Sequence, residues 1–260
     1  MADHLPTGKC HVWWARPTDA NPLLQVLLDT DEHQRWTALR RADDRDRFLV
    51  GCAMTRLALA RYLDQAPDQI AIDRACEWCA RPHGKPRLAN APAPRIEWSV
   101  SHSGERVGVA FTFGVPVGLD VEQCRPDVSI EELAPEVLTP PELGVFATIP
   151  SQRRVAAFFT YWTRKEAVAK ATGRGLTLPL NTFEVSEPTT DARLVTSPWD
   201  SSLAASVTMH DLSLDAEYAA CVALIGERSE RSERSECSRV MTRDGSALLR
   251  QTSRPPDAYL

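Results

Sequence analysis

Three carboxylates in two short motifs could hold a divalent cation. Asp120 and Glu122 stand two residues apart in a Gly-Leu-Asp-Val-Glu run, and Glu166 stands in a Trp-Thr-Arg-Lys-Glu run. Side chains two residues apart on a strand point to the same side, about 7 Å from each other. Because neighbouring negative charges repel each other and a cation relieves the repulsion, Asp120 and Glu122 are a candidate metal site. On a solvent-exposed face the same pair would be unremarkable.

Glu166 lies in the middle of the apolar face of a helix predicted from about 151 to 172. Ser151 is the predicted N-cap, and glycines follow the helix. A carboxylate on an apolar face is costly unless something compensates its charge. Either an ion pair with Lys170, one turn later, or a metal or catalytic role would do so. Arg164 is expected to point the opposite way, into water.

The elements that must position these residues alternate between long helices and sets of short strands. Apolar periodicity predicts helices near 31–39, 43–63 and 151–172. Alternating apolar and polar residues predict strands at 11–15, 69–74, 96–101, 107–113, 117–121, 182–185, 193–196, 203–208 and 218–224.

Each half of the chain therefore reads as a long helix combined with a small, mostly antiparallel sheet. This pattern predicts an α+β fold, a tandem pseudo-repeat of two similar halves with a crevice between them. The predicted halves are 1–115 and 116–226, and the second carries the metal site. From Glu227 the sequence repeats Glu-Arg-Ser and continues as a polar tail without a consistent apolar face. Region 227–260 is therefore predicted to be disordered and dispensable for folding and activity.

Composition places the chain among globular proteins, with 43% hydrophobic and 25% charged residues in a length of 260. The net charge of −5 argues against nucleic acid as a partner. No apolar stretch approaches the ~18 residues of a membrane-spanning helix, and the N-terminus has no signal pattern. We expect a cytoplasmic monomer with neither a nucleic-acid nor a membrane partner.

Seven cysteines, an odd number, are expected to be reduced thiols in a chain of this size. Cys76, Cys79 and His83 could be zinc ligands, with Cys124 or another cysteine as the fourth. Because a single C-x2-C pair also occurs in ordinary loops, a plain loop is the favoured interpretation.

Four short blocks follow one another along the chain: Gly84–Leu88, Ser99–Ser103, Gly118–Glu122 and Trp162–Lys170. They read GKPRL, SVSHS, GLDVE and WTRKEAVAK. In this order and spacing they resemble the 4′-phosphopantetheinyl transferases, of the larger single-chain type that activates carrier domains of peptide and polyketide synthases. The resemblance covers about residues 11–225. It implies a pseudo-dimer of two α+β halves, with coenzyme A bound in the cleft between them.

The resemblance also implies a reaction. Such enzymes transfer the 4′-phosphopantetheine group from coenzyme A to a serine hydroxyl of an acyl or peptidyl carrier protein. Adenosine 3′,5′-bisphosphate is released, and Mg²⁺ or Mn²⁺ is required.

The functional residues of the family carry over to matching positions. Asp120, Glu122 and Glu166 are expected to bind the metal, since Mg²⁺ favours a few carboxylates with substrate phosphates and water. Glu166 is also the expected base for the carrier serine, and Lys170 and Asp120 complete the catalytic set. The expected coenzyme-binding residues are Arg47, Arg56, Gly84, Lys85, Pro86, Arg87, Ser101, His102 and Lys170.

Two other functions could use the same residues. A metal-dependent phosphodiesterase or hydrolase would release phosphopantetheine with no acceptor protein present. A non-catalytic coenzyme A-binding module would be expected to have lost a metal carboxylate or Lys170, and all of these are present. The apolar segment 135–149 is either a docking surface for a carrier helix or part of the core, which is the usual place of such residues.

Overall fold

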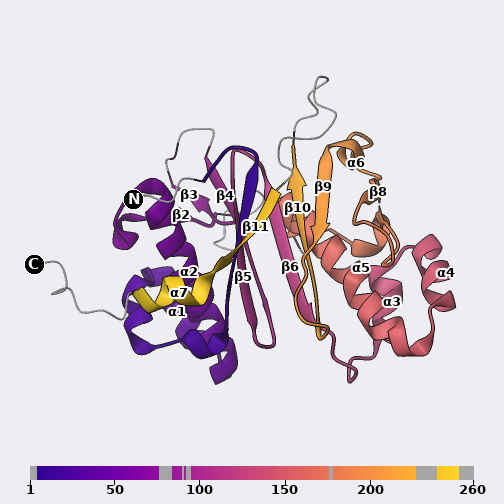
Figure 1. Cartoon of the computed structure of the whole chain (residues 1–260), viewed down its shortest axis with the longest axis horizontal. Coiled ribbons are helices and arrows are strands. Elements are labelled where there is room, and N and C mark those ends of the chain that lie inside the picture. Colours follow the sequence, from indigo (N-terminus) through magenta and orange to yellow (C-terminus); the bar gives the residue numbers. More distant parts are fainter. Residues whose placement is uncertain are drawn as a thin grey trace, which may run out of the picture.

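The computed structural model describes residues 5–75, 84–89, 91, 95–175, 178–226 and 239–251. It has the α+β architecture predicted from the sequence, with small sheets in the middle of the molecule and helices on either side (Figure 1). Each of the two main sheets is packed against one long helix. No described helix combines the length and the apolar character that crossing a bilayer would need.

The first sheet has four strands, in the order β11 (Arg239–Asp244), β1 (Lys9–Ala15), β5 (Arg106–Phe113) and β4 (Ile96–Ser103). Strands β4 and β5 form an antiparallel pair, and β1 runs antiparallel to β5. Helix α2 (Ala42–Leu63) packs against this sheet, as predicted, and buries Trp98 and Phe111 in a shared core. The smaller elements of this half are α1 (Thr30–Ala38), β2 (Ile72–Asp73) and β3 (Arg87–Leu88).

The second sheet has three antiparallel strands, in the order β6 (Val117–Gln123), β10 (Tyr218–Ile225) and β9 (Val207–Asp211). Helix α5 (Ser151–Ala171) packs against β6 and β10, and the helix predicted at 151–172 is thereby confirmed. The other elements of this half are α3 (Ile130–Val137), α4 (Pro140–Thr148), β7 (Glu184–Val185), β8 (Leu194–Thr196) and α6 (Leu203–Ser206).

The alternation along β6 has the orientation that the sequence predicts. Val117 and Leu119 join an apolar core with Val12 and Ala110 of the first sheet, and Val121 is also buried. The intervening residues of β6 therefore face α5 instead, because side chains alternate along a strand. This face carries the candidate metal ligands.

Two local predictions are wrong. Residues 203–208, predicted as a strand, begin as α6 and become β9 only at Val207. Asp200 accepts hydrogen bonds from the backbone and the hydroxyl of Ser202, a local turn that competes with extended backbone. Ser151 is the first residue of α5, and Pro150 occupies the N-cap position predicted for it.

The predicted disordered tail contains two ordered elements. Strand β11 runs parallel to β1, with Trp14 opposite Asp244, and helix α7 (Gly245–Arg250) follows it directly. Leu248 and Leu249 of α7 are buried in the core of the first half. Such a short apolar pair in a polar segment gives no periodic signal, and pairing with a strand far away in sequence leaves no local trace. Residues 227–238 and 252–260 lie outside the described residues.

The replacement Leu248→Ala should therefore destabilise the protein. Leu248 is 2% exposed, so the lost apolar contacts and the remaining cavity should cost about 2–5 kcal/mol in a urea titration. Val26→Ala is the control, because Val26 is 80% exposed and its replacement should cost less than about 0.5 kcal/mol. Equal effects of the two replacements would show that α7 is not part of the folded core.

Candidate active site

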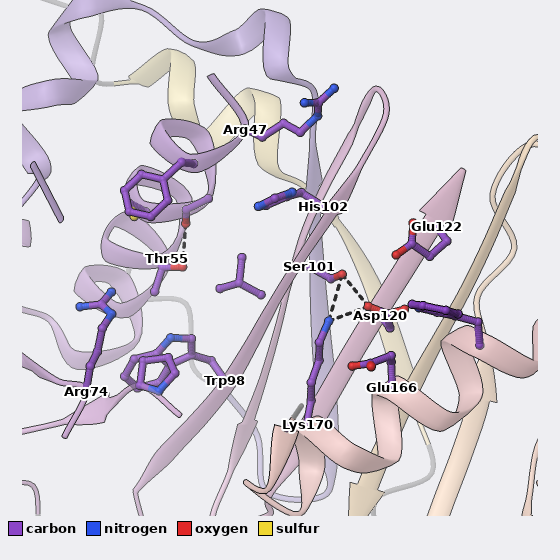
Figure 2. A pocket seen from close by; sticks show the side chains of 17 residues that line it. Arg47, Thr55, Arg74, Trp98, Ser101, His102, Asp120, Glu122, Glu166 and Lys170 are labelled. Carbon is purple, nitrogen blue, oxygen red and sulfur yellow. Dashed lines mark hydrogen bonds and ion pairs between the residues drawn. The ribbon is translucent and has the colours of Figure 1, made fainter. Parts of the chain in front are cut away.

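A cavity of about 520 Å³ opens between the two halves. Its walls come from α2 and β4 on one side and from β6 and α5 on the other, as Figure 2 shows. The cavity brings together most of the site residues predicted from the sequence, namely Arg47, Pro86, Ser101, His102, Asp120, Glu122, Glu166 and Lys170.

Asp120, in the middle of β6, is 3% exposed. Its Oδ1 accepts hydrogen bonds from Lys170 Nζ at 2.6 Å and from the hydroxyl of Ser101 at 2.9 Å. Its Oδ2 is buried and has no hydrogen-bond partner among the described residues. Because a buried acceptor without a partner costs free energy, this oxygen marks a place on the cavity wall where a ligand can bind.

Glu122 and Glu166 reach the same region from different elements. Glu122 follows Asp120 on β6 and accepts a hydrogen bond from the hydroxyl of Ser103 at 2.7 Å. Glu166 projects from α5 and makes no side-chain hydrogen bond or ion pair with any described residue. In Figure 2 the three carboxylates follow one another along one wall of the cavity.

Helix α5 lies this close to β6 because residue 118 is glycine. A Cβ atom at Gly118 would lie 2.0 Å from the carbonyl oxygen of Ala167 and 2.4 Å from the backbone nitrogen of Ala171. No side chain fits at such distances. The glycine therefore sets the distance between the strand that carries Asp120 and the helix that carries Glu166.

Burial and mutual repulsion change the acidity of two of these carboxyl groups. The pKa of Glu122 rises to about 7, because the group is largely removed from water and lies near the charge of Asp120. The same two causes raise the pKa of Glu166 above its usual value. A positive ion between these groups would offset both effects.

The three carboxylates fit a divalent cation by their donor chemistry. Among the described residues, no group of three Asp, Glu, His or Cys side chains is gathered closely enough to hold a metal ion by itself. Mg²⁺ does not need such a group, since it commonly binds one or two carboxylates together with substrate phosphates and water. The unpartnered Oδ2 of Asp120 and the raised pKa values of Glu122 and Glu166 are features that a bound cation would compensate.

Lys170 pairs with Asp120 rather than with Glu166. Its Nζ donates to Asp120 at 2.6 Å, to the carbonyl oxygen of Leu119 at 3.1 Å and to the hydroxyl of Ser101 at 3.2 Å. In the described part of the chain no ion pair joins Lys170 to Glu166. The i,i+4 ion pair considered for Glu166 is therefore wrong, and its carboxylate is left facing the cavity.

Two other cations of the same helix are structural. Arg164 is buried and bonds to Asp211 and to three backbone carbonyls. Its expected exposure was wrong, because β9 and the segment after β7 cover that face of α5, which local periodicity cannot show. Lys165 is also buried and pairs with Glu142 of α4 at 2.6 Å. Both residues hold α5 in place within its own half.

Arg47 and His102 place N–H donors at one end of the cavity. The Nε of Arg47 donates to the carbonyl oxygen of Gly104 at 2.8 Å, and its Nη1 pairs with Asp44 at 2.9 Å. Partial burial and the charges of Arg47 and Lys170 lower the pKa of His102. Guanidinium and imidazole N–H groups in this arrangement can bind a phosphate. The sequence-based choice of both residues therefore agrees with their position.

Ser101 belongs to a row of serines that joins the two halves. The three hydroxyl oxygens of the row each accept a hydrogen bond from a backbone N–H of β6. Leu119 donates to Ser99 at 3.0 Å, Val121 to Ser101 at 3.3 Å and Gln123 to Ser103 at 3.1 Å. The two-residue period of a strand places all three on the side of β4 that faces β6. Side chains, rather than a backbone ladder, thus satisfy this edge of β6.

Lys85 has a different place from the one expected. Together with Gly84 and Arg87 it lines a second cavity of about 230 Å³, which shares only Pro86 of this motif with the main cavity. The Nζ of Lys85 donates to the carbonyl oxygen of Val117 at 3.0 Å and to that of Ala171, the last residue of α5, at 3.5 Å. A cation is favourable at a helix C-terminus, so Lys85 ties the two halves together.

Arg56 lies outside both cavities, which corrects its expected contact with the coenzyme. It is 2% exposed and binds buried Glu32 at 2.8 Å and the carbonyl oxygen of Ile70 at 2.7 Å. Its face of α2 is covered by α1, so it lines neither cavity. Arg74 lines the main cavity instead and is held by Glu32 at 2.6 Å. No sequence pattern singled out Arg74.

The remaining wall of the main cavity is largely apolar. It includes Phe48 and Cys52 of α2, Trp98 of β4 and Trp162 of α5. The alternation along β4 predicted that Trp98 would be buried, but it could not place the ring beside a cavity. A wall of this kind suits a flat ring or an extended apolar chain.

Two further expectations concern segments beside the site. Cys76, Cys79 and His83, the possible zinc ligands, lie outside the described residues. In segment 135–149, Leu138 and Phe146 are buried in the core of the second half. For these two residues the core interpretation is confirmed, so they cannot belong to a docking surface.

Two family models match the chain in succession. The model described as "4′-phosphopantetheinyl transferase superfamily" matches residues 116–223, and the model described as "4′-phosphopantetheinyl transferase, N-terminal" matches residues 12–113. Together they span the four motifs quoted from the sequence.

Individual relatives agree with these matches. A putative 4′-phosphopantetheinyl transferase of Synechocystis sp. is 32% identical over 171 residues, which are 65% of this chain and 67% of that protein. The 4′-phosphopantetheinyl transferase HetI of Nostoc sp. is 31% identical over 199 residues, 75% of this chain and 81% of HetI. The transferase Sfp of Bacillus subtilis is 25% identical over 168 residues, 64% of this chain and 70% of Sfp.

The comparisons confirm the resemblance carried by the four motifs. They support transfer of phosphopantetheine from coenzyme A to a carrier protein, and they do not support the hydrolase or the non-catalytic module. The chain belongs to the 4′-phosphopantetheinyl transferase superfamily.

Proposed function

We propose that Asp120, Glu122 and Glu166 hold a Mg²⁺ ion while the enzyme transfers 4′-phosphopantetheine from coenzyme A to a carrier serine. The observation that carries this proposal is the buried, unpartnered Oδ2 of Asp120 beside two carboxyl groups of raised pKa. When bound, the ion would neutralise the negative charge of the pyrophosphate and the negative charge that develops on it during transfer. Mn²⁺ prefers the same oxygen donors and can serve in its place.

Glu166 is the proposed base for the carrier serine. Its carboxylate faces the cavity and makes no hydrogen bond or ion pair with any described residue, so an oxygen is available to accept the serine proton. As the serine proton moves to Glu166, the serine oxygen forms a bond to the phosphorus that carries pantetheine. The bond from this phosphorus to the bridging oxygen breaks, and adenosine 3′,5′-bisphosphate leaves with the electron pair.

Lys170 is the proposed donor to the transferring phosphoryl group. Its ammonium group borders the cavity and lies 2.6 Å from Asp120. This ion pair holds the Lys170 side chain beside the proposed metal ligands before the substrate binds. A charge-assisted N–H bond to a phosphate oxygen becomes stronger as negative charge develops there.

The rest of the coenzyme has complementary surfaces available. Arg47, His102 and Arg74 are proposed to bind its phosphates, since all three border the cavity and carry N–H donors. Phe48 and Trp98 offer the apolar wall for adenine or the pantetheine arm. The proposed contribution of Lys85 is indirect, through the carbonyl oxygens that it binds on β6 and α5.

The direct test is mass spectrometry of apo-carrier proteins incubated with the enzyme, coenzyme A and Mg²⁺. We expect a carrier to gain the mass of phosphopantetheine, and replacement of its acceptor serine by alanine should abolish the gain. Release of free phosphopantetheine at the same rate without any carrier would contradict the proposal and favour a hydrolase.

The metal proposal predicts a pH-dependent stabilisation by Mg²⁺. The pKa of Glu122 is raised from 4.5 to about 7 in the folded protein, so the folded state binds this proton more tightly than the unfolded state. The stability that this bound proton gives to the folded protein is fully present below about pH 4.5 and is lost as the pH rises through about 7. Mg²⁺ competes with the proton, and should therefore raise the melting temperature more at pH 8 than at pH 5.5.

The control for this prediction is Glu122→Gln, which removes both the proton site and one proposed ligand. The variant should show a smaller Mg²⁺ shift and a weaker dependence of that shift on pH in the same melting experiment. A shift of equal size at both pH values in the unsubstituted protein would argue against carboxylate ligands.

A further inference from the structure

The row of serines on β4 does more than join two strands. Each hydroxyl oxygen in the row is occupied as an acceptor of a backbone N–H of β6, which leaves its hydrogen free to donate elsewhere. Ser103 donates to Glu122 Oε2 at 2.7 Å, and Ser101 donates to Asp120 Oδ1 at 2.9 Å. Two hydroxyl groups of the row therefore donate hydrogen bonds to proposed metal ligands.

Each of these two hydroxyls bridges neighbouring residues of β6. Ser103 accepts the N–H of Gln123 and donates to the side chain of Glu122, the preceding residue. The backbone fixes the oxygen, and the fixed oxygen then directs its hydrogen to one side. A carboxylate held from a rigid backbone in this way loses little rotamer freedom when it binds an ion.

Ser101 is shared, whereas Ser103 serves a single carboxylate. Ser101 also accepts from Lys170 at 3.2 Å, so a change there alters the cation as well as Asp120. Ser103 has no such contact with Lys170 among the described residues. Its only described side-chain acceptor is the Glu122 carboxylate, and this carboxylate has no other hydrogen-bond partner among the described residues.

We propose that Ser103 is a positioning residue that orients Glu122 for the divalent cation. The inference rests on the proposed function, because it assumes that Glu122 is a ligand. Ser103 does not touch the reacting atoms itself. It acts from the neighbouring half of the protein, by donating a hydrogen bond to Glu122 Oε2. The same hydroxyl accepts the backbone N–H of Gln123, so it both orients a metal ligand and links the two halves.

Ser99 provides a matched control within the same row. Its oxygen accepts the N–H of Leu119 at 3.0 Å, as Ser103 does for Gln123, but its hydroxyl reaches no carboxylate in the described structure. Loss of the Ser99 hydroxyl therefore removes one hydrogen bond between the halves and no contact with a proposed metal ligand. Loss of the Ser103 hydroxyl removes one hydrogen bond between the halves and also the hydrogen bond to Glu122.

The test is a titration with Mn²⁺, followed by electron paramagnetic resonance, on the full-length enzyme saturated with coenzyme A. Ser103→Ala should weaken Mn²⁺ binding by about 10–100-fold, the usual cost of losing a residue that orients a metal ligand. Ser99→Ala should leave Mn²⁺ affinity unchanged. Ser103→Thr keeps the hydroxyl and should retain Mn²⁺ affinity, and this rescue would not be expected if only packing mattered.

Other outcomes would overturn the inference in distinguishable ways. If Glu122→Gln weakens Mn²⁺ binding but Ser103→Ala does not, Ser103 has no positioning role although the metal site stands. Equal weakening by Ser99→Ala and Ser103→Ala would show that the row acts only by joining the halves. If Glu122→Gln binds Mn²⁺ as well as the unsubstituted enzyme, the proposed ligand set itself fails. Should Ser103→Ala not fold, Ser103→Cys, a weaker donor of similar size, replaces it.

Discussion

Replacing Glu166 by glutamine is expected to lower the rate of carrier labelling by at least about 100-fold, the contribution of a positioned base. The amide keeps the shape of the side chain but can neither accept the serine proton nor offer a charged oxygen to Mg²⁺. Because the Glu166 carboxylate has no described hydrogen-bond partner, its replacement should not break a structural contact. The readout is the initial rate of phosphopantetheine mass gain on a carrier protein.

The control for this replacement is Glu136→Gln, an exposed glutamate of α3 that changes the net charge by the same amount. Its rate should match that of the unsubstituted enzyme. Equal melting temperatures for the Glu166 variant and the original protein would show that activity, not folding, was lost. Near-normal labelling by the Glu166 variant would mean that another group takes the serine proton.

Gly118→Ala should have the largest effect of a single added methyl group. The new Cβ atom would meet backbone atoms of α5 at 2.0 and 2.4 Å, and these cannot move aside as a flexible side chain could. Helix α5 must shift as a whole, which we expect to cost at least about 1–3 kcal/mol of unfolding free energy. The shift also displaces Glu166 and Lys170 from β6, so labelling should fall even in the fraction that folds.

Gly144→Ala is the matched control, because a Cβ atom at this position of α4 meets nothing within 4 Å. Alanine is the better residue inside a helix by about 0.5–1 kcal/mol, so this variant should be unchanged or slightly more stable. The free energies of unfolding of both variants, measured by urea titration, separate the cost of the steric clash at Gly118 from the general effect of replacing a glycine. Similar stability of the two variants would contradict the close approach of β6 and α5.

The sequence predicted the parts of the fold and site that depend on local spacing. The apolar period of α5 and the alternation of β6 predicted the faces that carry Glu166 and the Asp120–Glu122 pair, because each element alone fixes which way its side chains point. Their meeting at one cavity was expected only from the resemblance carried by the four motifs. The choice of Arg47 and His102 also agrees with their positions on that cavity.

The errors arise where distant segments decide the outcome. Arg164 is covered by β9 and Arg56 by α1, and neither neighbour can be read from the helix in which the arginine lies. Arg74 reaches the cavity because Glu32, on another element, holds its guanidinium group. Strand β11 was missed because its partner β1 begins the chain. Local patterns predict orientation within an element, but not what the rest of the chain brings against it.

The parallel pairing of β11 with β1 has a consequence for biosynthesis. The first sheet is completed by a segment that follows the whole second sheet in the sequence, so its β1 edge stays open until residues 239–244 have left the ribosome. The second sheet needs nothing beyond β10 and can mature earlier, against the usual N-terminal-first order of translation. An open edge is a template for strands of other nascent chains. A released chain that ends shortly before residue 239 should therefore be prone to aggregation, because its second sheet can form while the β1 edge of its first sheet stays open.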